Sequence, residues 1–477
     1  MTNQSRYQIE LTCVDALVPE NHLLREIERH IDFSFIREKT MPFYNETLGR
    51  PPIDPVRLFK MMLIGYLYGI RSERQLEQEI ITNVAYRWFL GLGLSDRVPD
   101  HSTISYNRTN RFKGTNIFQE TFDEIVRMAI EHGMVGGRLL ATDSTHIKAN
   151  ANKNRYAMQE VEQTPGEYLQ ELEAAVNKDR EDHGKGPLPP AKTETETKNH
   201  KVSITDPESG YLMRKGKPEM FAYLEHRTVD HKAGIITDSY VTPGNFSDSV
   251  VYVERLHRQI KTFGFQDSLE AVTLDSGYMT PYICMKTAKM GITAVIGGRN
   301  APTKDGVIPK SEFVYDREQD QYICPKGQAL KYHTTTRGGY RDYQSDPAVC
   351  SLCPLLDQCT TNKANVRSVQ RHVWEDFKEQ VMQYSQSDTG KVVYKIRSQT
   401  IERSFAEAKE LHGLRTARLR GKDNMQEQTL MTAIAQNVKK IVKRLGKRLA
   451  SGTFDGCRVF IRHLQKFAYW NNKRVTA

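Results

Sequence analysis

The first 135 residues carry apolar side chains at the spacing of α-helices. From Pro55 onward they recur at Phe59, Met62, Leu63, Tyr66, Leu67 and Ile70. This pattern predicts a helix with one buried face, and Pro55 suits its first turn. Ser72, with Gln75 three residues later, is a capping-box start for the next helix. Further helices are predicted after Asn83, after Ser102 and from Asn116 to His132. Residues 1–135 are therefore expected to form an all-α domain, in which a helix-turn-helix arrangement and simple helix packing both satisfy the pattern.

After the pair Gly136-Gly137 the pattern changes to short apolar runs, which are typical of buried strands. The predicted elements are a strand from Leu139 into Asp143, a hairpin of Phe221 to Val229 with Ile235 to Val241, a helix from about Ser247 to Phe263, a strand from Leu269 to Asp275, a helix through Met290 and a strand from Thr293 to Ile296. This is the element order of a ribonuclease H-like α/β core. Both aspartates then stand at strand ends, where α/β sheets place their sites.

Composition divides the rest of the chain. Residues 150–200 are charged and poor in apolar side chains, which predicts a flexible insertion with one helix around Tyr168 to Val176. Residues 305–372 contain a group of cysteines, and residues 438–477 are expected to form a basic C-terminal tail. The predicted α/β core therefore comprises residues 136–300 plus 390–450, with the cysteine segment inserted into it.

The overall composition is that of a soluble, basic protein. The chain has 477 residues, too many for one core, with 38% hydrophobic residues and a formal net charge of +10. This charge favours a polyanionic partner without identifying one. The longest apolar run, Met61 to Ile70, is too short to span a bilayer, and residues 1–10 do not resemble a signal peptide. We expect a cytoplasmic protein with no membrane partner.

Basic residues gather near the C-terminus in two clusters without acids. The clusters are Arg415, Arg418, Arg420 and Lys422, and then Lys439, Lys440, Lys443, Arg444, Lys447 and Arg448. A solvated helix face is the commoner origin of such a run. Two clusters beside a candidate catalytic helix nevertheless favour contacts with phosphates.

Three acidic residues have the arrangement that metal-dependent phosphodiester chemistry needs. Asp143 and Asp275 end predicted strands, and Glu402 lies two turns before Lys409 on a helix predicted from about Lys395. Two divalent ions roughly 4 Å apart activate the attacking oxygen and stabilise the leaving one, and hard ions prefer carboxylates. Each acid alone is equally compatible with a turn, a cap or an exposed helix. Only the three together favour a site for two Mg²⁺ or Mn²⁺ ions.

The chain resembles the bacterial DDE insertion-sequence transposases, in the branch with a Tyr-Arg-Glu-Lys signature. The resemblance covers nearly the whole chain. Its motifs are Gly49-Arg-Pro-Pro52, Pro99-Asp-His-Ser-Thr103, Thr142-Asp-Ser-Thr145, Asp275-Ser-Gly-Tyr278, and Glu402 with Phe405, Lys409 and Gly413. It implies that Asp143, Asp275 and Glu402 are the catalytic metal ligands, and that the helical domain serves DNA binding or dimerisation.

The resemblance also implies that Tyr394, Arg397 and Lys409 grip phosphates of the transposon end. Four residues separate Arg397 from Glu402, where the usual signature has three. A slip of one residue turns a side chain by about 100° on an α-helix. The resemblance therefore applies more directly to Lys409 than to Arg397, and Arg403 is a candidate substitute.

Four of the seven cysteines, Cys324, Cys350, Cys353 and Cys359, lie in one segment as C-x25-C-x2-C-x5-C. In a cytosolic chain this favours a metal site over disulfides. Four cysteine ligands suit a closed, structural zinc site in a zinc-ribbon-like insertion, while the spacing alone also fits an iron–sulfur cluster. Cys13, Cys284 and Cys457 are scattered and read as buried thiols. His101, His146, His226 and His231 form no ligand-spaced pair.

The function implied by the resemblance is cut-and-paste transposition, with hydrolysis at the transposon ends followed by strand transfer from the 3′ hydroxyl. Partners would be double-stranded DNA, both terminal inverted repeats and target, bound by a homodimer near the nucleoid. A catalytically silent or domesticated DNA-binding regulator is the alternative. A metal-dependent nuclease that cuts without joining would use the same site.

Overall fold

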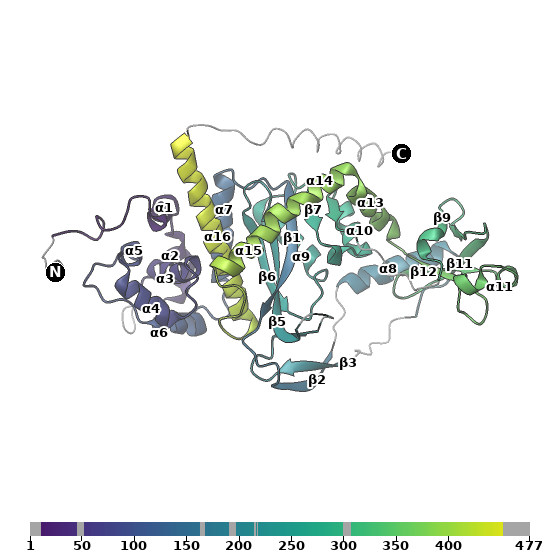
Figure 1. Cartoon of the computed structure of the whole chain (residues 1–477), viewed down its shortest axis with the longest axis horizontal. Helices are drawn as coiled ribbons and strands as arrows, with labels where there is room; N and C mark the ends of the chain where they lie inside the picture. The colour runs from purple at the N-terminus through teal and green to yellow at the C-terminus, as the bar shows by residue number, and fades with distance from the viewer. Residues whose placement is uncertain are drawn as a thin grey trace, which may run out of the picture. The chain divides into compact units, whose positions relative to one another are not determined.

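The computed structural model describes residues 11–44, 52–162, 167–189, 197–213, 216, 218–298 and 307–451. The chain divides into two compact units, each described here by itself (Figure 1). Unit 1 comprises Met1–Met158, Lys201–Leu274 and Val392–Ala477, and unit 2 comprises Gln159–His200 and Asp275–Lys391. Within the described ranges, no helix is both long and apolar enough to cross a membrane.

The N-terminal part of unit 1 is helical, as predicted. Its helices are α1 (Leu23–His30), α2 (Phe35–Thr40), the 3-10 turn η2 (Met41–Phe43), α3 (Pro55–Leu67), α4 (Glu73–Thr82), α5 (Val84–Phe89), α6 (His101–Tyr106), the π-helical turn η3 (Asn107–Arg111) and α7 (Ile117–Glu131). The side chains of Ser72, Asn83 and Asp100 accept hydrogen bonds from the first turns of α4, α5 and α6. The motif segment at residues 49–51 lies outside the described residues.

The sheet of unit 1 follows the predicted order of strand, hairpin, helix and strand. Its elements are β1 (Leu139–Lys148), β4 (Gly210–Leu212), β5 (Met220–Asp230), β6 (Ile236–Pro243), α9 (Tyr252–Phe263) and β7 (Ala271–Leu274). β5 runs antiparallel to β1, β6 and β4, whereas β7 pairs with β1 in parallel. A separate two-stranded sheet consists of β2 (Tyr156–Glu162) and β3 (Thr197–Ser203).

The C-terminal helices of unit 1 are α14 (Asp388–Arg397), the π-helical turn η6 (Ser398–Glu402), α15 (Arg403–Leu411) and α16 (Lys422–Ser451). In Figure 1 the yellow α16 runs beside α7, and it also packs on α1, α3 and β6. The expected basic tail over residues 438–477 therefore begins inside a core helix. Val438, Ile441 and Val442 are buried and share the helix with the lysines, at the spacing of one helix face. Residues 452–477 lie outside the described residues.

Amide side chains of α16 satisfy the backbone of β6. Gln426 accepts a hydrogen bond from the Val241 N–H at 2.8 Å and donates one to the Ser239 carbonyl at 2.8 Å. Asn437 accepts from the Ile236 N–H and donates to its carbonyl, both at 2.8 Å. These bonds fix α16 against the strand and leave fewer unpaired groups along it.

Unit 2 contains a five-stranded antiparallel sheet in the order β13-β12-β11-β10-β9. Its elements are α8 (Glu167–Asp182), η4 (Ser276–Tyr278), α10 (Pro281–Lys289), β8 (Thr293–Ile296), η5 (Lys310–Glu312), β9 (Val314–Asp316), β10 (Gln321–Ile323), β11 (Ala329–Thr335), β12 (Tyr340–Ser345), α11 (Pro347–Cys350), α12 (Leu356–Cys359), β13 (Ser368–His372) and α13 (Glu375–Gln386). Phe313, Tyr322, Leu330, Tyr343 and Val369 form the core under the sheet. The cysteine segment is thus part of a folded β module.

The helix predicted around Tyr168 to Val176 in the segment 150–200 is present as α8, which has 16 residues and extends to Asp182. Leu172 and Val176 of α8 are buried against Met285 and Trp374. Asp179 accepts a hydrogen bond from the Arg341 Nε at 2.6 Å. Charged residues around the apolar pair lower the average hydrophobicity of the segment, so composition alone understates its packing. Residues 190–196 lie outside the described residues.

Candidate active site

Asp143 lies in the middle of β1, and the register of the sheet relates it to Asp275. Thr142 is paired with Leu274, the last residue of β7. Asp143 follows this pair within β1, whereas Asp275 follows the last residue of β7 and precedes η4. The division between the units falls at this peptide bond, and Asp275 is the first residue of unit 2. The prediction that both aspartates stand at strand ends is wrong for Asp143, because β1 continues to Lys148, whereas Asp275 does follow the last residue of β7.

Arg397 joins Asp143 to Glu402. Its Nη2 donates to the Asp143 Oδ2 at 2.5 Å, and its Nη1 donates to the Glu402 Oε1 at 3.2 Å. Arg397 is 8% exposed, whereas the Glu402 side chain is 55% exposed. A guanidinium with two carboxylates neutralises charge that would otherwise repel. Two of the three predicted metal ligands therefore lie within reach of one cation.

The additional residue between Arg397 and Glu402 lies in a π-helical turn, η6, between α14 and α15. A π-turn accommodates one extra residue within a continuous helix, since its hydrogen bonds close at i to i+5. Arg397 and Glu402 are five residues apart and their side chains meet. The expected misalignment of Arg397 by about 100° on an α-helix is therefore wrong, because the helix is not purely α at this point.

Lys409, two turns after Glu402, reaches back to β1. Its Nζ donates to the Thr145 Oγ1 at 2.5 Å, and Thr145 lies on the same face of β1 as Asp143. Burial lowers the pKa of Lys409 from its usual value. The ammonium group therefore stands beside the carboxylates on the side of the strand that faces α15.

A buried ion pair, which the sequence analysis missed, fixes this helix to the sheet. Glu225 and Arg227 on β5 are both 0% exposed, and they are the register partners of Thr145 and Asp143. The Arg227 Nη1 donates to the Ser404 Oγ and to the Gln436 Oε1, both at 2.9 Å. The sequence does contain a signal for this ion pair, because Glu225 and Arg227 are opposite charges two residues apart in a strand that is otherwise predicted to be buried.

The remaining predicted DNA-binding residues are dispersed. The Arg397 guanidinium lies 5.9 Å from the centre of the Tyr394 ring. Arg403 is exposed, and Arg415 pairs with Glu410. The Arg420 Nε donates to the Asn150 carbonyl at 3.1 Å. Arg418 is partly buried, with its guanidinium 4.1 Å from the centre of the Tyr66 ring.

The four predicted zinc ligands lie in the β module as free, partly buried thiols. Burial, together with Cys350, Cys324 and Cys353, raises the pKa of the Cys359 thiol, so the four share one neighbourhood. In the described part of the chain, however, no three of their sulfurs approach within 4.8 Å of one another. Of the other cysteines, Cys284 is buried as predicted, Cys13 is exposed, contrary to the prediction, and Cys457 lies outside the described residues.

One group of potential ligands in the described ranges does meet this distance, and it consists of Glu77, Asp100 and His101. The His101 ring pairs with Glu77 at 2.8 Å, and its backbone N–H donates to the same carboxylate at 3.0 Å. Asp100 caps α6 through the Ser102 N–H at 2.8 Å. These hydrogen bonds attach α6 to α4, which explains why the three side chains lie close together.

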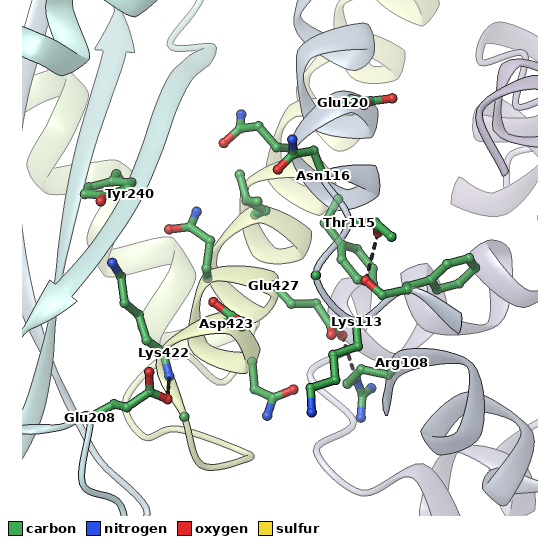
Figure 2. Close-up of a pocket in the computed structure, with 18 of the residues that line it drawn as sticks. Arg108, Lys113, Thr115, Asn116, Glu120, Glu208, Tyr240, Lys422, Asp423 and Glu427 are labelled. Carbon is green, nitrogen blue, oxygen red and sulfur yellow. Dashed lines mark hydrogen bonds and ion pairs between the residues drawn. The ribbon is translucent and has the colours of Figure 1, made fainter. Parts of the chain in front are cut away.

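A cleft of about 860 Å³ opens between η3–α7, β6 and the start of α16, all in unit 1 (Figure 2). Its charges are largely paired. Arg108 bonds Glu427, as the dashed line in Figure 2 marks, and Arg258 bonds Asp123 at 2.6 Å. Lys422 faces Tyr240, with its Nζ 5.4 Å from the ring centre. The wall is polar but close to charge balance, and none of the predicted carboxylate ligands lines it.

Two family models match the sequence. One is described as a transposase domain (DUF772) and covers residues 12–110, and the other is described as a transposase DDE domain and covers residues 323–442. No curated protein matches the chain. The first match spans the N-terminal helices through α6, and the second includes Glu402, Lys409 and all four clustered cysteines.

Among solved structures, the chain is similar to a piggyBac transposase synaptic complex with hairpin DNA. The identity is 10%, with 95% of this chain and 79% of that chain covered and a TM-score of 0.33. It is also similar to a Mos1 transposase paired-end complex with the left transposon end, at 11% identity, 55% and 64% coverage and a TM-score of 0.16. These TM-scores are too low to identify the fold. The relation to transposases therefore depends on the two family models.

Proposed function

The chain belongs to the DDE insertion-sequence transposases, and from that premise we propose that it catalyses cut-and-paste transposition of an insertion sequence. Water attacks the phosphodiester at each transposon end, and the freed 3′ hydroxyl then attacks the target DNA. The observation that carries this proposal is the bridge from Arg397 to Asp143 and Glu402. It supports a single site for two carboxylates that are 259 positions apart in the sequence.

We assign Asp143, Asp275 and Glu402 as ligands of two Mg²⁺ or Mn²⁺ ions. The donor set fits such ions, since it offers carboxylate oxygens and already accommodates a positive charge between Asp143 and Glu402. These ions supply activation of the attacking oxygen and stabilisation of the leaving one. With these ions bound, Arg397 would be free to contact a DNA phosphate, together with Tyr394 and Lys409.

The fold proposed for the catalytic core is ribonuclease H-like. It is supported by the order of β1, the β5–β6 hairpin, α9 and β7, with β5 antiparallel and β7 parallel to β1. The proposed domains are the helical domain over residues 1–135, the core over 136–300 plus 390–450, and the cysteine insertion over 305–372. The helical domain, for which we propose a role in DNA binding or dimerisation, packs on α16 and is therefore part of unit 1.

Cys324, Cys350, Cys353 and Cys359 would hold a structural zinc ion. Four thiols in one partly buried neighbourhood suit a closed tetrahedral site. Cys324 follows β10, and the other three cysteines lie from the end of α11 to the end of α12, so a shared zinc ion would join these elements. The module would then be rigid and take no part in the chemistry.

The partners proposed are the terminal inverted repeats and a target duplex, bound by two copies of the chain. The test is incubation of the full-length protein with labelled duplexes from both flanks of its gene, with Mg²⁺ or Mn²⁺. We expect cleavage at the flank junction and strand joining by the wild type, and neither by the Asp275→Ala variant. Asp267→Ala, at an exposed position in the loop before β7, is the matched control and should retain activity.

Binding by the wild type without cleavage or joining would contradict the proposal and support a DNA-binding regulator. Cleavage without joining would support a nuclease. Equal cleavage by Asp275→Ala would remove Asp275 from the site.

A further inference from the structure

A second cleft in unit 1, of about 390 Å³, lies between the N-terminal helices and the segment that follows α15. The end of α3, the start of α4, α6, η3 and residues 418–419 line it. Four arginines take part in its wall: Arg71, Arg74, Arg108 and Arg418. Three of them come from the N-terminal helical region, and one comes from the basic segment after the Glu402 helix.

The charges of this cleft do not balance. Arg108 bonds Glu73 and Glu427, the latter at 2.9 Å. In the described part of the chain, Arg71, Arg74 and Arg418 have no carboxylate within 4.0 Å. Arg71 instead contacts the Thr416 hydroxyl, and Arg74 contacts the His101 ring at 3.3 Å. Three guanidinium groups therefore surround the cleft without anionic partners, in contrast to the larger cleft, where Arg108 and Arg258 are paired.

Arg418 is the part of this cleft that is costly to keep without an anion. It is partly buried, and its Nε has no hydrogen-bond partner. Burial and the nearby Arg71 and Arg108 lower the pKa of Arg418 from its usual value. A buried cation that is repelled by its neighbours is stabilised when an anion enters. The amino-terminal end of α4 adds a partial positive charge on the same wall.

We propose that this arginine cleft binds a phosphate group of the DNA backbone. The inference rests on the proposed function for the identity of the polyanion, and it goes further by assigning the contact to Arg71, Arg74 and Arg418. Guanidinium groups suit phosphate because they donate two parallel hydrogen bonds. The contact reads no base, so it fixes the position of the duplex and not its sequence.

The cleft is fixed to the helix that carries Glu402. The buried His412, one residue after α15, donates from its Nδ1 to the Tyr66 carbonyl at 2.7 Å. Gly69 has a φ of +68°, and a Cβ there would lie 2.8 Å from the Leu411 carbonyl oxygen. The ends of α3 and α15 are therefore in direct contact. A phosphate held in the cleft is placed at a set distance from Glu402 and Lys409.

The test is the salt dependence of duplex binding by the full-length protein, measured by fluorescence anisotropy in EDTA with a flank duplex and a scrambled duplex. Each phosphate contact contributes about −0.9 to the slope of log K against log salt. We expect Arg71→Gln/Arg74→Gln to reduce the slope by about one to two and to weaken both duplexes equally. Both side chains are exposed, so the variant should keep the wild-type melting temperature.

Arg127→Gln is the control, since it removes one positive charge from α7, where the side chain is 42% exposed. An unchanged slope in the double variant, or an equal change in Arg127→Gln, overturns the proposal. A second arm replaces DNA by inorganic phosphate in a thermal-shift assay. The double variant could lose stabilisation by inorganic phosphate and still show an unchanged salt dependence of DNA binding. This result would assign the cleft to a free anion and overturn the DNA contact. Binding in EDTA needs no catalysis, so failure of cleavage leaves this result intact.

Discussion

Asp143 and Glu402 in unit 1 and the cysteine group in unit 2 belong to two proposed metal sites, but their charges are handled differently. In the first, Arg397 bridges Asp143 and Glu402, and the buried Arg227 fixes the helix behind them. In the second, the thiols are free, and among the described residues no three of their sulfurs lie within 4.8 Å of one another. Side chains of the protein thus organise Asp143 and Glu402, whereas the proposed zinc ion would have to organise the cysteine group. Removal of metal should abolish DNA cleavage at the carboxylate site and lower the stability of the module that contains the cysteines.

The largest effect should come from Glu402→Gln. Loss of a metal ligand should cost more than the roughly 10-fold to 100-fold typical of residues behind the ligands, so cleavage of a flank duplex should fall more than about 100-fold. Thermal unfolding should be nearly unchanged, because the Glu402 side chain is 55% exposed. Glu410→Gln, at an exposed position on α15, is the control. A parallel loss of stability would show that Glu402 is structural.

Zinc removal should act on stability and leave the carboxylates intact. Structural zinc contributes roughly 10 kcal/mol or more to the folding of small modules, so Cys353→Ser should abolish bound zinc and make the β module sensitive to protease. Elemental analysis and limited proteolysis measure the two effects. Cys13→Ser, at an exposed position in unit 1, should change neither. A wild type that is stable without metal would refute the zinc assignment.

Substitution of Arg397 tests whether the guanidinium stands where a metal ion binds. Arg397→Gln removes the competing cation, so Mn²⁺ affinity without DNA should rise, by about tenfold if about 1.4 kcal/mol of competition is relieved. The metal-free protein should become less stable, because Asp143 and Glu402 lose their common partner. Isothermal titration and thermal unfolding give the two values. Arg403→Gln, six residues further along and exposed, should match the wild type, and unchanged Mn²⁺ affinity in Arg397→Gln would refute competition.

The stability of both units against unfolding should decrease moderately as the pH falls. Burial lowers the pKa of His226 in unit 1 and of His372 in unit 2 to about 4 each. The unfolded chain takes up these protons near pH 6.5, so the stability contribution is complete above that pH and is lost as pH falls towards 4. His372→Asn should flatten the pH dependence of the unfolding of unit 2 over this range and leave that of unit 1 unchanged. Thermal unfolding from pH 7 to pH 4.5 measures this.

The smallest effect is expected from shortening the π-turn. Deletion of Gln399, an exposed residue of η6, should convert the turn to α-helix and keep Arg397 facing Glu402. Cleavage should then stay within about tenfold of the wild type, a change of about 1.4 kcal/mol in the barrier. Insertion of one alanine after Gln399 is the opposite change and should impair cleavage more. Equal damage from both would mean that the π-turn does not set the alignment.

Local patterns in the sequence predicted much of the fold. Caps at Ser72 and Asn83 marked the starts of α4 and α5, and β8 has the predicted bounds. These features depend on interactions within a few residues. The bridge from Arg397 to Asp143 spans 254 positions, and no local period contains it. α16 was missed as a core helix because its buried stripe is interrupted by lysines.

The amide side chains that α16 aligns along β6 have a consequence for assembly. A bare sheet edge invites a strand from another molecule, which is a common route to fibres and swapped dimers. Here Gln426 and Asn437 already occupy backbone groups of that edge. Addition of a strand from a second copy along β6 would therefore have to displace these side chains first.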